Sequence, residues 1–216
     1  MSEPLQNQYN ASARFSSFLI TVVLLFGLVA CSDKTPPLNK LSSDAVVVAF
    51  GDSLTYGTGA KDHEAYPAQL SDLIQREVIN EGRPGELSSD GLKRLPAVLD
   101  EHQPELLILC HGGNDLLRKK NAQSIVSNLK AMIAEAKKRG IQVILIGVPE
   151  PALFLMESAP FYSKIASSEN IPFEENILPT IESDNALKSD TIHPNAAGYR
   201  KFAEAIAKLL TLAGAV

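Results

Sequence analysis

A serine, a histidine and an aspartate in two distant parts of the chain have the types and spacing needed for nucleophilic catalysis. Ser53 lies in the stretch 51–54 (Gly-Asp-Ser-Leu), and Asp190 and His193 are three residues apart near the C-terminus. A serine hydroxyl is a poor nucleophile unless a base takes its proton, and that base needs a carboxylate to orient it. Asp190 can hold Nδ1–H of His193 and leave Nε2 free to face Ser53. These residue types predict acyl transfer through Ser53.

The tetrahedral intermediate of acyl transfer needs preorganised hydrogen-bond donors for its oxyanion, and two further stretches can supply them. Gly85, in the stretch 80–86, allows the backbone to approach a ligand closely because glycine has no side chain. Asn114, in the stretch 112–115 (Gly-Gly-Asn-Asp), can add a side-chain N–H. Both stretches therefore belong to the candidate site.

The elements that must position these residues follow from the apolar pattern of the chain. Apolar runs predict strands at residues 45–50, 78–80, 106–111 and 141–148. Apolar residues recur at helical spacing within 70–78, 92–99, 125–136 and 199–210. This alternation predicts a parallel sheet covered on both faces by helices. Ligand sites in such sheets lie beyond the carboxyl ends of the strands, which is where three of the four polar stretches fall.

The four polar stretches resemble those of the SGNH (GDSL) hydrolase family in order and in spacing. The match comprises Gly-Asp-Ser-Leu at 51–54, the Gly85 region with its continuation at 91–96, Gly-Gly-Asn-Asp at 112–115 and Asp-x-x-His-Pro-Asn at 190–195. The likeness extends along nearly the whole chain after its N-terminal segment. It is similar in particular to the branch of bacterial thioesterase I, lysophospholipase and arylesterase.

The resemblance implies a role for each site residue and a fold. Ser53 is the nucleophile, His193 is the general base and then the general acid, and Asp190 orients His193. The oxyanion hole consists of the N–H of Ser53, the N–H of Gly85 and the side chain of Asn114. The implied fold is a flavodoxin-like three-layer α/β sandwich, with a central parallel sheet of about five strands in the order 2-1-3-4-5. No cofactor is implied.

Two parts of the chain depart from the family pattern. Residues 84–87 read Pro-Gly-Glu-Leu, where relatives usually carry a stretch like Ser-Gly-Asp-Thr. The stretch 149–188 is poorly matched and rich in proline and aromatic residues, so we expect a substrate-facing loop region there. Substrate identity therefore follows less directly from the resemblance than mechanism does.

The predicted function is hydrolysis of carboxylic esters through an acyl-enzyme intermediate, with lysophospholipids and thioesters among the candidate substrates. One alternative keeps the same residues and removes O-acetyl groups from envelope or imported polysaccharide. Another alternative, from a different class, is a lipoprotein that binds an envelope ligand without turnover. The intact set of five site residues argues against this last alternative.

Several of these residues also have simpler interpretations. The stretch 51–59 could be a phosphate-binding loop, but it lacks the Gly-Lys-Ser/Thr ending of such loops. The stretch 190–195 could instead be a surface turn without a catalytic role, with Asn195 as the N-cap of the last helix. His111 could line the site or serve as a structural histidine at a strand end. Of the other candidates, His63 and His102 are interpreted as surface residues. Asp52 and Asp115 are expected to support the geometry of their loops.

The N-terminal segment predicts export and attachment to a membrane. Residues 18–30 are almost wholly apolar and follow Arg14, and the run is shorter than the roughly 20 residues that a membrane span needs. Leu-Val-Ala-Cys at 28–31 resembles a lipobox, so Cys31 is the predicted lipidation site. This divides the chain into a signal peptide (1–30), a polar tether (31–43) and the hydrolase domain (44–216). An uncleaved anchor helix is the alternative, and either interpretation predicts a bacterial protein facing the periplasm or the cell exterior.

Composition excludes some classes of partner. The chain has 216 residues, a net charge of −5 and a pI near 5.4, which argues against nucleic-acid binding because phosphate recognition needs a clustered basic surface. No group of residues has metal-ligand spacing. Of the two cysteines, Cys110 is interpreted as a small buried apolar residue, although a disulfide to Cys31 is the alternative. The expected partners are a small or lipid-like ester and, through the lipid anchor, a membrane.

Overall fold

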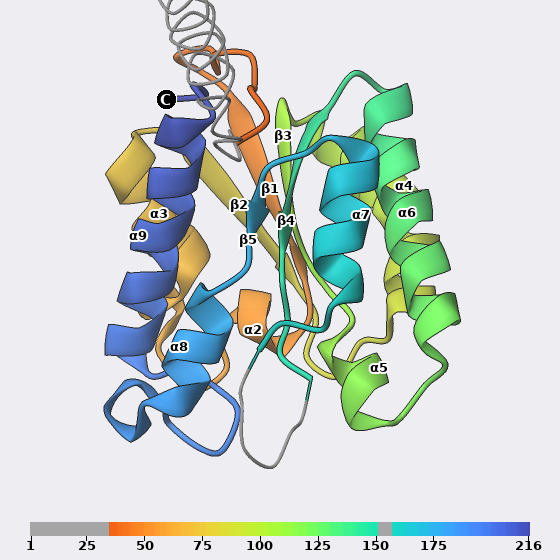
Figure 1. Cartoon of the computed structure of the whole chain (residues 1–216). Coiled ribbons are helices and arrows are strands. Elements are labelled where there is room, and N and C mark those ends of the chain that lie inside the picture. Colours follow the sequence, from red (N-terminus) through yellow and green to blue (C-terminus); the bar gives the residue numbers. More distant parts are fainter. Residues whose placement is uncertain (1–34, 151–156) are drawn as a thin grey trace, which may run out of the picture. The chain divides into compact units, whose positions relative to one another are not determined.

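A five-stranded parallel sheet lies at the centre of the computed structural model, which describes residues 35–150 and 157–216. The strand order is β2-β1-β3-β4-β5, as the family resemblance implied (Figure 1). The strands are β1 (Val46–Gly51), β2 (Glu77–Gly82), β3 (Leu106–Cys110), β4 (Gln142–Ile146) and β5 (Phe173–Glu174). All four strand pairs are parallel, so the carboxyl ends of the strands meet at one edge of the sheet.

Helices cover both faces of this sheet, which confirms the predicted three-layer arrangement (Figure 1). One face carries α3 (Tyr66–Ile74) and α9 (Ala196–Leu212), with α8 (Ile177–Ser183) beside α9. The other face carries α4 (Ser88–His102), α6 (Ala122–Lys138) and α7 (Phe161–Glu169). Two short helices, α2 (Ser53–Tyr56) and α5 (Gly113–Leu117), directly follow the carboxyl ends of β1 and β3, and the 3-10 helices are η1 (Asp62–Glu64) and η2 (Asn185–Leu187).

Burial explains which strands the sequence predicted well. All residues of β3 are fully buried, and β1 is buried from Val47 to Gly51, because both strands lie in the middle of the sheet with helices on either side. Such strands are apolar without interruption, which is the pattern that predicted them. The edge strand β2 is partly exposed and its only apolar side chains are the neighbouring Val78 and Ile79, so its predicted length was too short. The opposite edge, β5, has two residues and no apolar run, so its position in the sequence was not predicted, although the resemblance implied a fifth strand.

Two sequence predictions need correction. The helical stripe predicted over 70–78 ends earlier, because α3 stops at Ile74, Gln75 takes a left-handed conformation (φ 54°), and β2 starts at Glu77. The stretch 149–188 is not one substrate-facing loop, because it contains α7, β5 and α8. Tyr162 of α7 is fully buried and donates a hydrogen bond to the carbonyl of His111 at 2.8 Å. The apolar and aromatic residues of the stretch 149–188 therefore contribute to the core as well as to the site.

The segment before β1 packs against the C-terminal end of the domain. Leu41 is buried, and its N–H donates to the carbonyl of Ala215 at 2.9 Å, while the N–H of Leu38 donates to that of Ala213 at 2.8 Å. The compact unit accordingly runs from Thr35 to Val216 and includes residues 35–43 of the predicted tether.

The predicted signal peptide and Cys31 lie outside the described residues. Within the part of the chain that the structure describes, no helix combines the length and the apolar character that a membrane crossing requires.

Candidate active site

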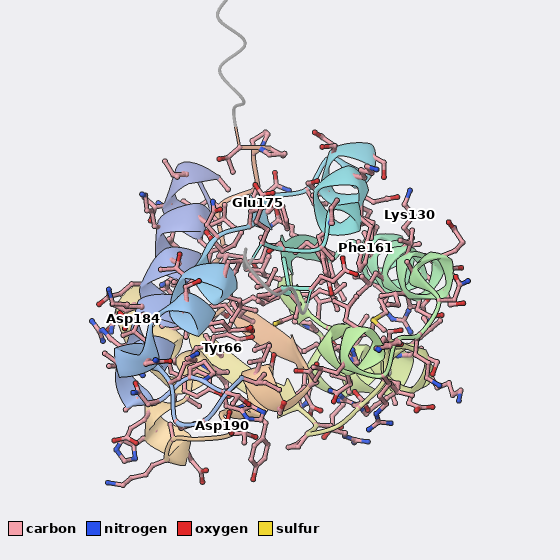
Figure 2. The ribbon with its side chains drawn as sticks, turned by 60° about the horizontal axis from the view of Figure 1, so that its bottom comes forward. Tyr66, Lys130, Phe161, Glu175, Asp184 and Asp190 are labelled. Carbon is pink, nitrogen blue, oxygen red and sulfur yellow. The ribbon has the colours of Figure 1, made fainter. Side chains whose placement is uncertain are left out.

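The candidate site lies at the edge where the carboxyl ends of the strands meet, and Figure 2 looks onto this end of the molecule with Asp190 labelled. The first strand ends at Gly51, where a side chain would not fit because an added Cβ would lie 2.1 Å from the carbonyl oxygen of Cys110. Asp52 follows and caps α2, accepting a hydrogen bond from the N–H of Leu54 at 3.1 Å. Ser53 is therefore held at the first position of a short helix, directly beyond the sheet.

Ser53, His193 and Asp190 form a continuous chain of hydrogen bonds. His193 Nε2 lies 3.0 Å from Ser53 Oγ, and His193 Nδ1 lies 2.7 Å from Asp190 Oδ2. The serine is half-buried, whereas the aspartate side chain is 51% exposed. The fold thus brings together three side chains that come from the end of β1 and from the loop before α9.

Backbone hydrogen bonds within this loop fix the aspartate and its charge. Asp190 Oδ1 accepts from the N–H groups of Ile192 and His193, each at 2.8 Å. Burial on its own would raise the pKa of Asp190, but these two bonds and the contact with the imidazole outweigh it and lower the pKa to about 2. A carboxylate can only accept hydrogen bonds, so Nδ1 of His193 carries the proton. Nε2 is then the acceptor, and the hydroxyl of Ser53 donates to it.

The three predicted oxyanion donors line one cavity together with His193. Gly85 follows β2 and has φ 78°, a conformation that residues with a side chain rarely adopt. Asn114 lies in the first turn of α5, and its Nδ2 donates one hydrogen bond to Asp52 Oδ2 at 3.2 Å. A side-chain amide has two N–H bonds, so the second remains for a ligand in the cavity.

Asp52 lies on the cavity wall, but its role is to support the site. Its side chain is almost fully buried, and burial raises its pKa. Its two oxygens accept from the N–H of Leu54 and from the amide of Asn114, so one carboxyl group joins the nucleophile's helix to an oxyanion donor. These contacts match the loop-supporting role that the sequence analysis assigned to it.

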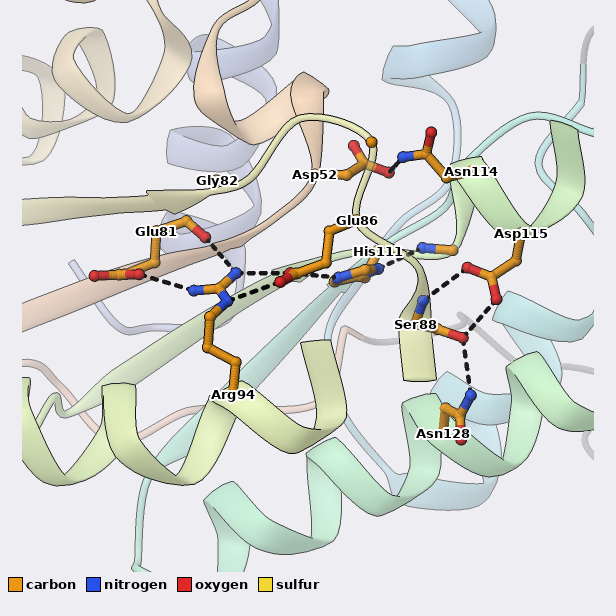
Figure 3. A network of polar contacts seen from close by, with 12 residues as sticks. Asp52, Glu81, Gly82, Glu86, Ser88, Arg94, His111, Asn114, Asp115 and Asn128 are labelled. Atoms are coloured by element: carbon orange, nitrogen blue, oxygen red, sulfur yellow. Dashed lines mark hydrogen bonds and ion pairs between the residues drawn. The ribbon is translucent and has the colours of Figure 1, made fainter. Parts of the chain in front are cut away.

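A buried polar network links the loop of Gly85 to the strand that precedes Asn114 (Figure 3). The carboxylate of Glu86 accepts from Arg94 Nε at 3.0 Å and Nη2 at 2.8 Å, and it lies 3.1 Å from His111 Nε2. The N–H of Gly112 donates to His111 Nδ1 at 3.0 Å, so Nε2 carries the proton and donates to Glu86. Arg94 also pairs with Glu81 at 2.8 Å. His111 is fully buried and is not among the cavity's lining residues, so it is a structural histidine.

A second bridge joins the start of α4, just after the Gly85 loop, to α5, which carries Asn114 (Figure 3). The N–H and the hydroxyl of Ser88 donate to Asp115 at 2.8 and 2.9 Å, and Asn128 donates to the Ser88 hydroxyl at 2.9 Å. Asp115 follows Asn114 directly, and Ser88 lies three residues after Gly85. The two loops that carry oxyanion donors are therefore held at two points each, which preorganises the donors.

The cavity beside Ser53 has a volume of about 560 Å³ and a mostly apolar wall. Pro84, where the chain departs from the family pattern, lies on this wall, and the carbonyl of the adjacent Gly85 accepts from Arg118 at 3.3 Å. Among the described residues, the cavity is lined by Asp52, Ser53, Leu54, Thr58, Pro84, Gly85, Gly113, Asn114, Leu117, Val148, Pro149, Glu182, Thr191, Ile192 and His193. Across residues 35–150 and 157–216, no group of three or more acidic, histidine or cysteine side chains is placed to hold a metal ion.

Sequence reasoning did not single out every residue near the site. Glu182 lines the cavity from α8, in a part of the chain without family motifs, and nothing in its sequence context indicates this position. The pairing of Glu86 with Arg94 was also missed, since each charge alone is typical of a surface residue. His63 is exposed, as predicted, but His102 is only 17% exposed and lies 3.1 Å from Glu81.

Comparison with known proteins places these residues in a family context. The model of the GDSL-like Lipase/Acylhydrolase family matches residues 49–201, a range that contains all five predicted site residues. Thioesterase 1/protease 1/lysophospholipase L1 of Escherichia coli (strain K12) is 30% identical over 200 residues, covering 89% of this chain and 90% of that protein. The arylesterase of Vibrio mimicus is 28% identical over 202 residues, covering 89% and 96%. The crystal structure of TesA superposes with a TM-score of 0.70 at 26% identity, covering 77% of this chain and 99% of that one.

The network around Glu86 predicts a pH-dependent contribution to stability. Burial alone would raise the pKa of Glu86, but hydrogen bonds from His111 and Arg94 and the charge of Arg94 lower it to about 2. Folding therefore favours the charged form of Glu86. Its contribution to the unfolding free energy is fully present above the ordinary pKa of glutamate and is lost as the pH falls toward 2. Glu86→Gln should lower the unfolding free energy by about 1–3 kcal/mol near pH 7, and by progressively less between about pH 5 and pH 2.

Urea unfolding of wild type and variant across this pH range measures the effect. Glu101→Gln, at an exposed glutamate of the same helix as Arg94, is the matched control and should change little at any pH. A deficit for Glu86→Gln that stays constant down to pH 2 would show that the charge of Glu86 is not what stabilises the network.

Proposed function

This chain belongs to the GDSL-like lipase/acylhydrolase family, and from that membership we propose that it hydrolyses carboxylic esters with Ser53 as the nucleophile. The observation that carries the proposal is the 3.0 Å contact between His193 Nε2 and Ser53 Oγ, with Asp190 on the far side of the ring. A base within hydrogen-bond reach of a serine, itself oriented by a carboxylate, is the arrangement that activates a hydroxyl for acyl transfer.

Acylation begins when Ser53 Oγ attacks the ester carbonyl carbon and its proton passes to His193 Nε2. The carbonyl oxygen becomes an oxyanion, which accepts hydrogen bonds from the N–H of Ser53, the N–H of Gly85 and the amide of Asn114. The positive charge that forms on His193 is stabilised by Asp190, whose low pKa keeps it charged. Collapse of the intermediate breaks the bond to the leaving alcohol, which takes the proton from Nε2. The acyl group remains on Ser53.

Deacylation repeats these steps with water as the nucleophile. A water molecule transfers a proton to His193 Nε2 as its oxygen attacks the acyl carbon, and the same donors hold the second oxyanion. When this intermediate collapses, the Ser53 oxygen leaves and takes the proton back, which releases the carboxylic acid. The same machinery accepts a thioester, because a thiolate is a good leaving group and the donors contact only the acyl oxygen.

The cavity supports substrates with an apolar part of modest size. Leu54, Leu117, Val148 and Ile192 contribute apolar side chains to a space of about 560 Å³, enough for a short or medium acyl chain. Acyl esters, including lysophospholipids, and acyl thioesters are therefore the proposed substrates, in keeping with relatives described as thioesterase, lysophospholipase and arylesterase. An acetylated polysaccharide is the competing substrate, and it would leave most of this apolar wall without a partner.

Ser53→Ala and His193→Ala should each lower kcat/KM by roughly a thousandfold or more, because the residues act as one unit. The measurement is release of p-nitrophenol from esters of rising acyl length, beside release of acetate from acetylated sugars. Wild type should be faster on acyl chains longer than acetyl than on the acetylated sugars.

The control is Ser163→Ala, a serine on α7 that does not line the cavity. Near-normal turnover by Ser53→Ala would reject the mechanism, whereas preference for acetylated sugars would keep the mechanism and change the substrate. A fluorophosphonate probe that fails to label wild-type protein at Ser53 would favour a ligand-binding lipoprotein without turnover.

We further propose that the domain is exported and tethered to a bacterial membrane through a lipid on Cys31. The support is the sequence pattern alone: a short apolar segment at 18–30, the lipobox-like stretch 28–31, and the polar residues that follow. A membrane tether would place the site near lipid-derived esters.

Metabolic labelling with palmitate in a bacterial host tests the tether. The label should be present in wild type and in Cys110→Ser, whose cysteine is buried in β3, and absent in Cys31→Ser. Label that persists in Cys31→Ser, or its absence in wild type, would contradict lipidation at this residue.

A further inference from the structure

The cavity beside Ser53 carries an ionisable residue, Glu182, that the proposed mechanism does not use. It lies on α8 directly after Ile181, which is fully buried, as is Leu178 one turn earlier. These two apolar contacts fix α8 against the core. The position of Glu182 on the cavity wall is therefore set by the packing of a helix and not by the conformation of a loop.

Two acidic residues of the described part of the chain line this cavity, and they differ in which groups they bind. Asp52 is 2% exposed, and its oxygens are occupied by the N–H of Leu54 and the amide of Asn114. Among the described residues, no hydrogen bond or ion pair reaches the carboxylate of Glu182. Lys188 donates to the backbone carbonyl of Glu182 at 2.6 Å and not to its side chain. The carboxylate of Glu182 is therefore available to a molecule in the cavity.

The surroundings of Glu182 make its negative charge energetically costly. Burial raises its pKa to about 7, and the positive charge of Lys188 only partly opposes this rise. Within residues 35–150 and 157–216, the other ionisable groups on the cavity wall are Asp52 and His193, and neither is paired with Glu182. A carboxylate in an apolar site is stabilised by a proton or by a cation that arrives with a ligand.

We propose that Glu182 gives the cavity a charge preference, so that it favours esters bearing an ammonium group over neutral esters of the same shape and disfavours esters bearing a carboxylate. This inference rests on the proposed ester hydrolysis and extends it to the substrate class. The cation would be a quaternary or primary ammonium on the acyl or the alcohol part, within reach of α8 when the carbonyl lies at Ser53. The apolar residues of the wall would contact the intervening carbon chain.

Matched pairs of esters test this preference. On the alcohol side, choline esters are compared with 3,3-dimethylbutyl esters, in which carbon replaces the charged nitrogen. On the acyl side, p-nitrophenyl esters with chains ending in trimethylammonium, tert-butyl or carboxylate are compared. At pH 8, wild type should show a higher kcat/KM for the cationic member of at least one pair, and Glu182→Gln should lower that ratio about tenfold, the factor that a charge interaction of about 1.4 kcal/mol produces.

The pH dependence of the same ratio gives an independent readout. His193 acts on both members of a pair, so its titration cancels in the ratio, and Asp52 and Lys188 are unchanged in the variant. As the pH rises from about 6 to 8, Glu182 loses its proton and becomes negative, so the ratio of cationic to neutral ester should rise in wild type. The ratio should stay flat in Glu182→Gln.

Two further variants test whether the charge of Glu182 itself sets the preference. Glu175→Gln removes the same charge from an exposed residue just before α8 and should keep the wild-type ratio (Figure 2). Glu182→Asp keeps the charge and should retain a cation preference, which a purely structural role would not require. A ratio that is unchanged in Glu182→Gln, or a wild type that prefers the neutral or anionic member of every pair, would overturn the proposal.

A binding measurement distinguishes failure of this inference from failure of the proposed function. Calorimetric titration of Ser53→Ala with a choline ester and its 3,3-dimethylbutyl counterpart requires no turnover. Tighter binding of the cationic ester, lost when Glu182→Gln is added, would support the charge preference even if wild type hydrolysed none of the esters. Equal binding of the two would overturn it, whatever the outcome for ester hydrolysis.

Discussion

The hydrogen bond between Ser53 and His193 is the interaction on which the rest of the site depends, because it joins residues 140 positions apart in the chain. A parallel sheet makes this contact possible, since it gathers the loops after its strands at one edge. Ser53 comes from the end of β1, which is buried on both sides, and His193 comes from the loop that enters α9. The backbone bonds that Asp190 accepts within its own loop then set the direction of the imidazole.

The oxyanion donors depend on a different set of contacts. Gly85 and Asn114 stand on loops that follow the two strands on either side of β1, and two side-chain bridges lock these loops together. Buried charges are costly unless they are paired, and the network meets this cost by surrounding Glu86 with donors from Arg94 and His111. The guanidinium of Arg94 also lies 4.1 Å from the centre of a core phenylalanine ring, so the network is continuous with the core. The residues of this network therefore both stabilise the fold and hold the oxyanion donors in place.

The sequence predicted those strands and site residues that leave a pattern in a short stretch of the chain. Strands β1 and β3 lie between two layers of helices, and their unbroken apolar runs identify them. The five site residues could be named because they stand in short stretches whose residue types are constrained by the reaction. Contacts that depend on register, such as Glu86 with His111 across 25 positions, leave no comparable pattern. Glu182 likewise leaves no pattern in the sequence, because its position on the cavity wall follows from the packing of α8. The two-residue β5 is too short to show any periodicity.

The pH profile of kcat/KM on a neutral ester tests the central claim most directly, because only neutral imidazole can take the proton from Ser53. Asp190 stays charged throughout the mildly acidic range, since its pKa is about 2, so it does not contribute a second ionisation there. The account predicts that kcat/KM falls about tenfold per pH unit on the acidic side, following one ionisation. A rate that stays flat from neutral to mildly acidic pH would contradict the role of His193 as the base.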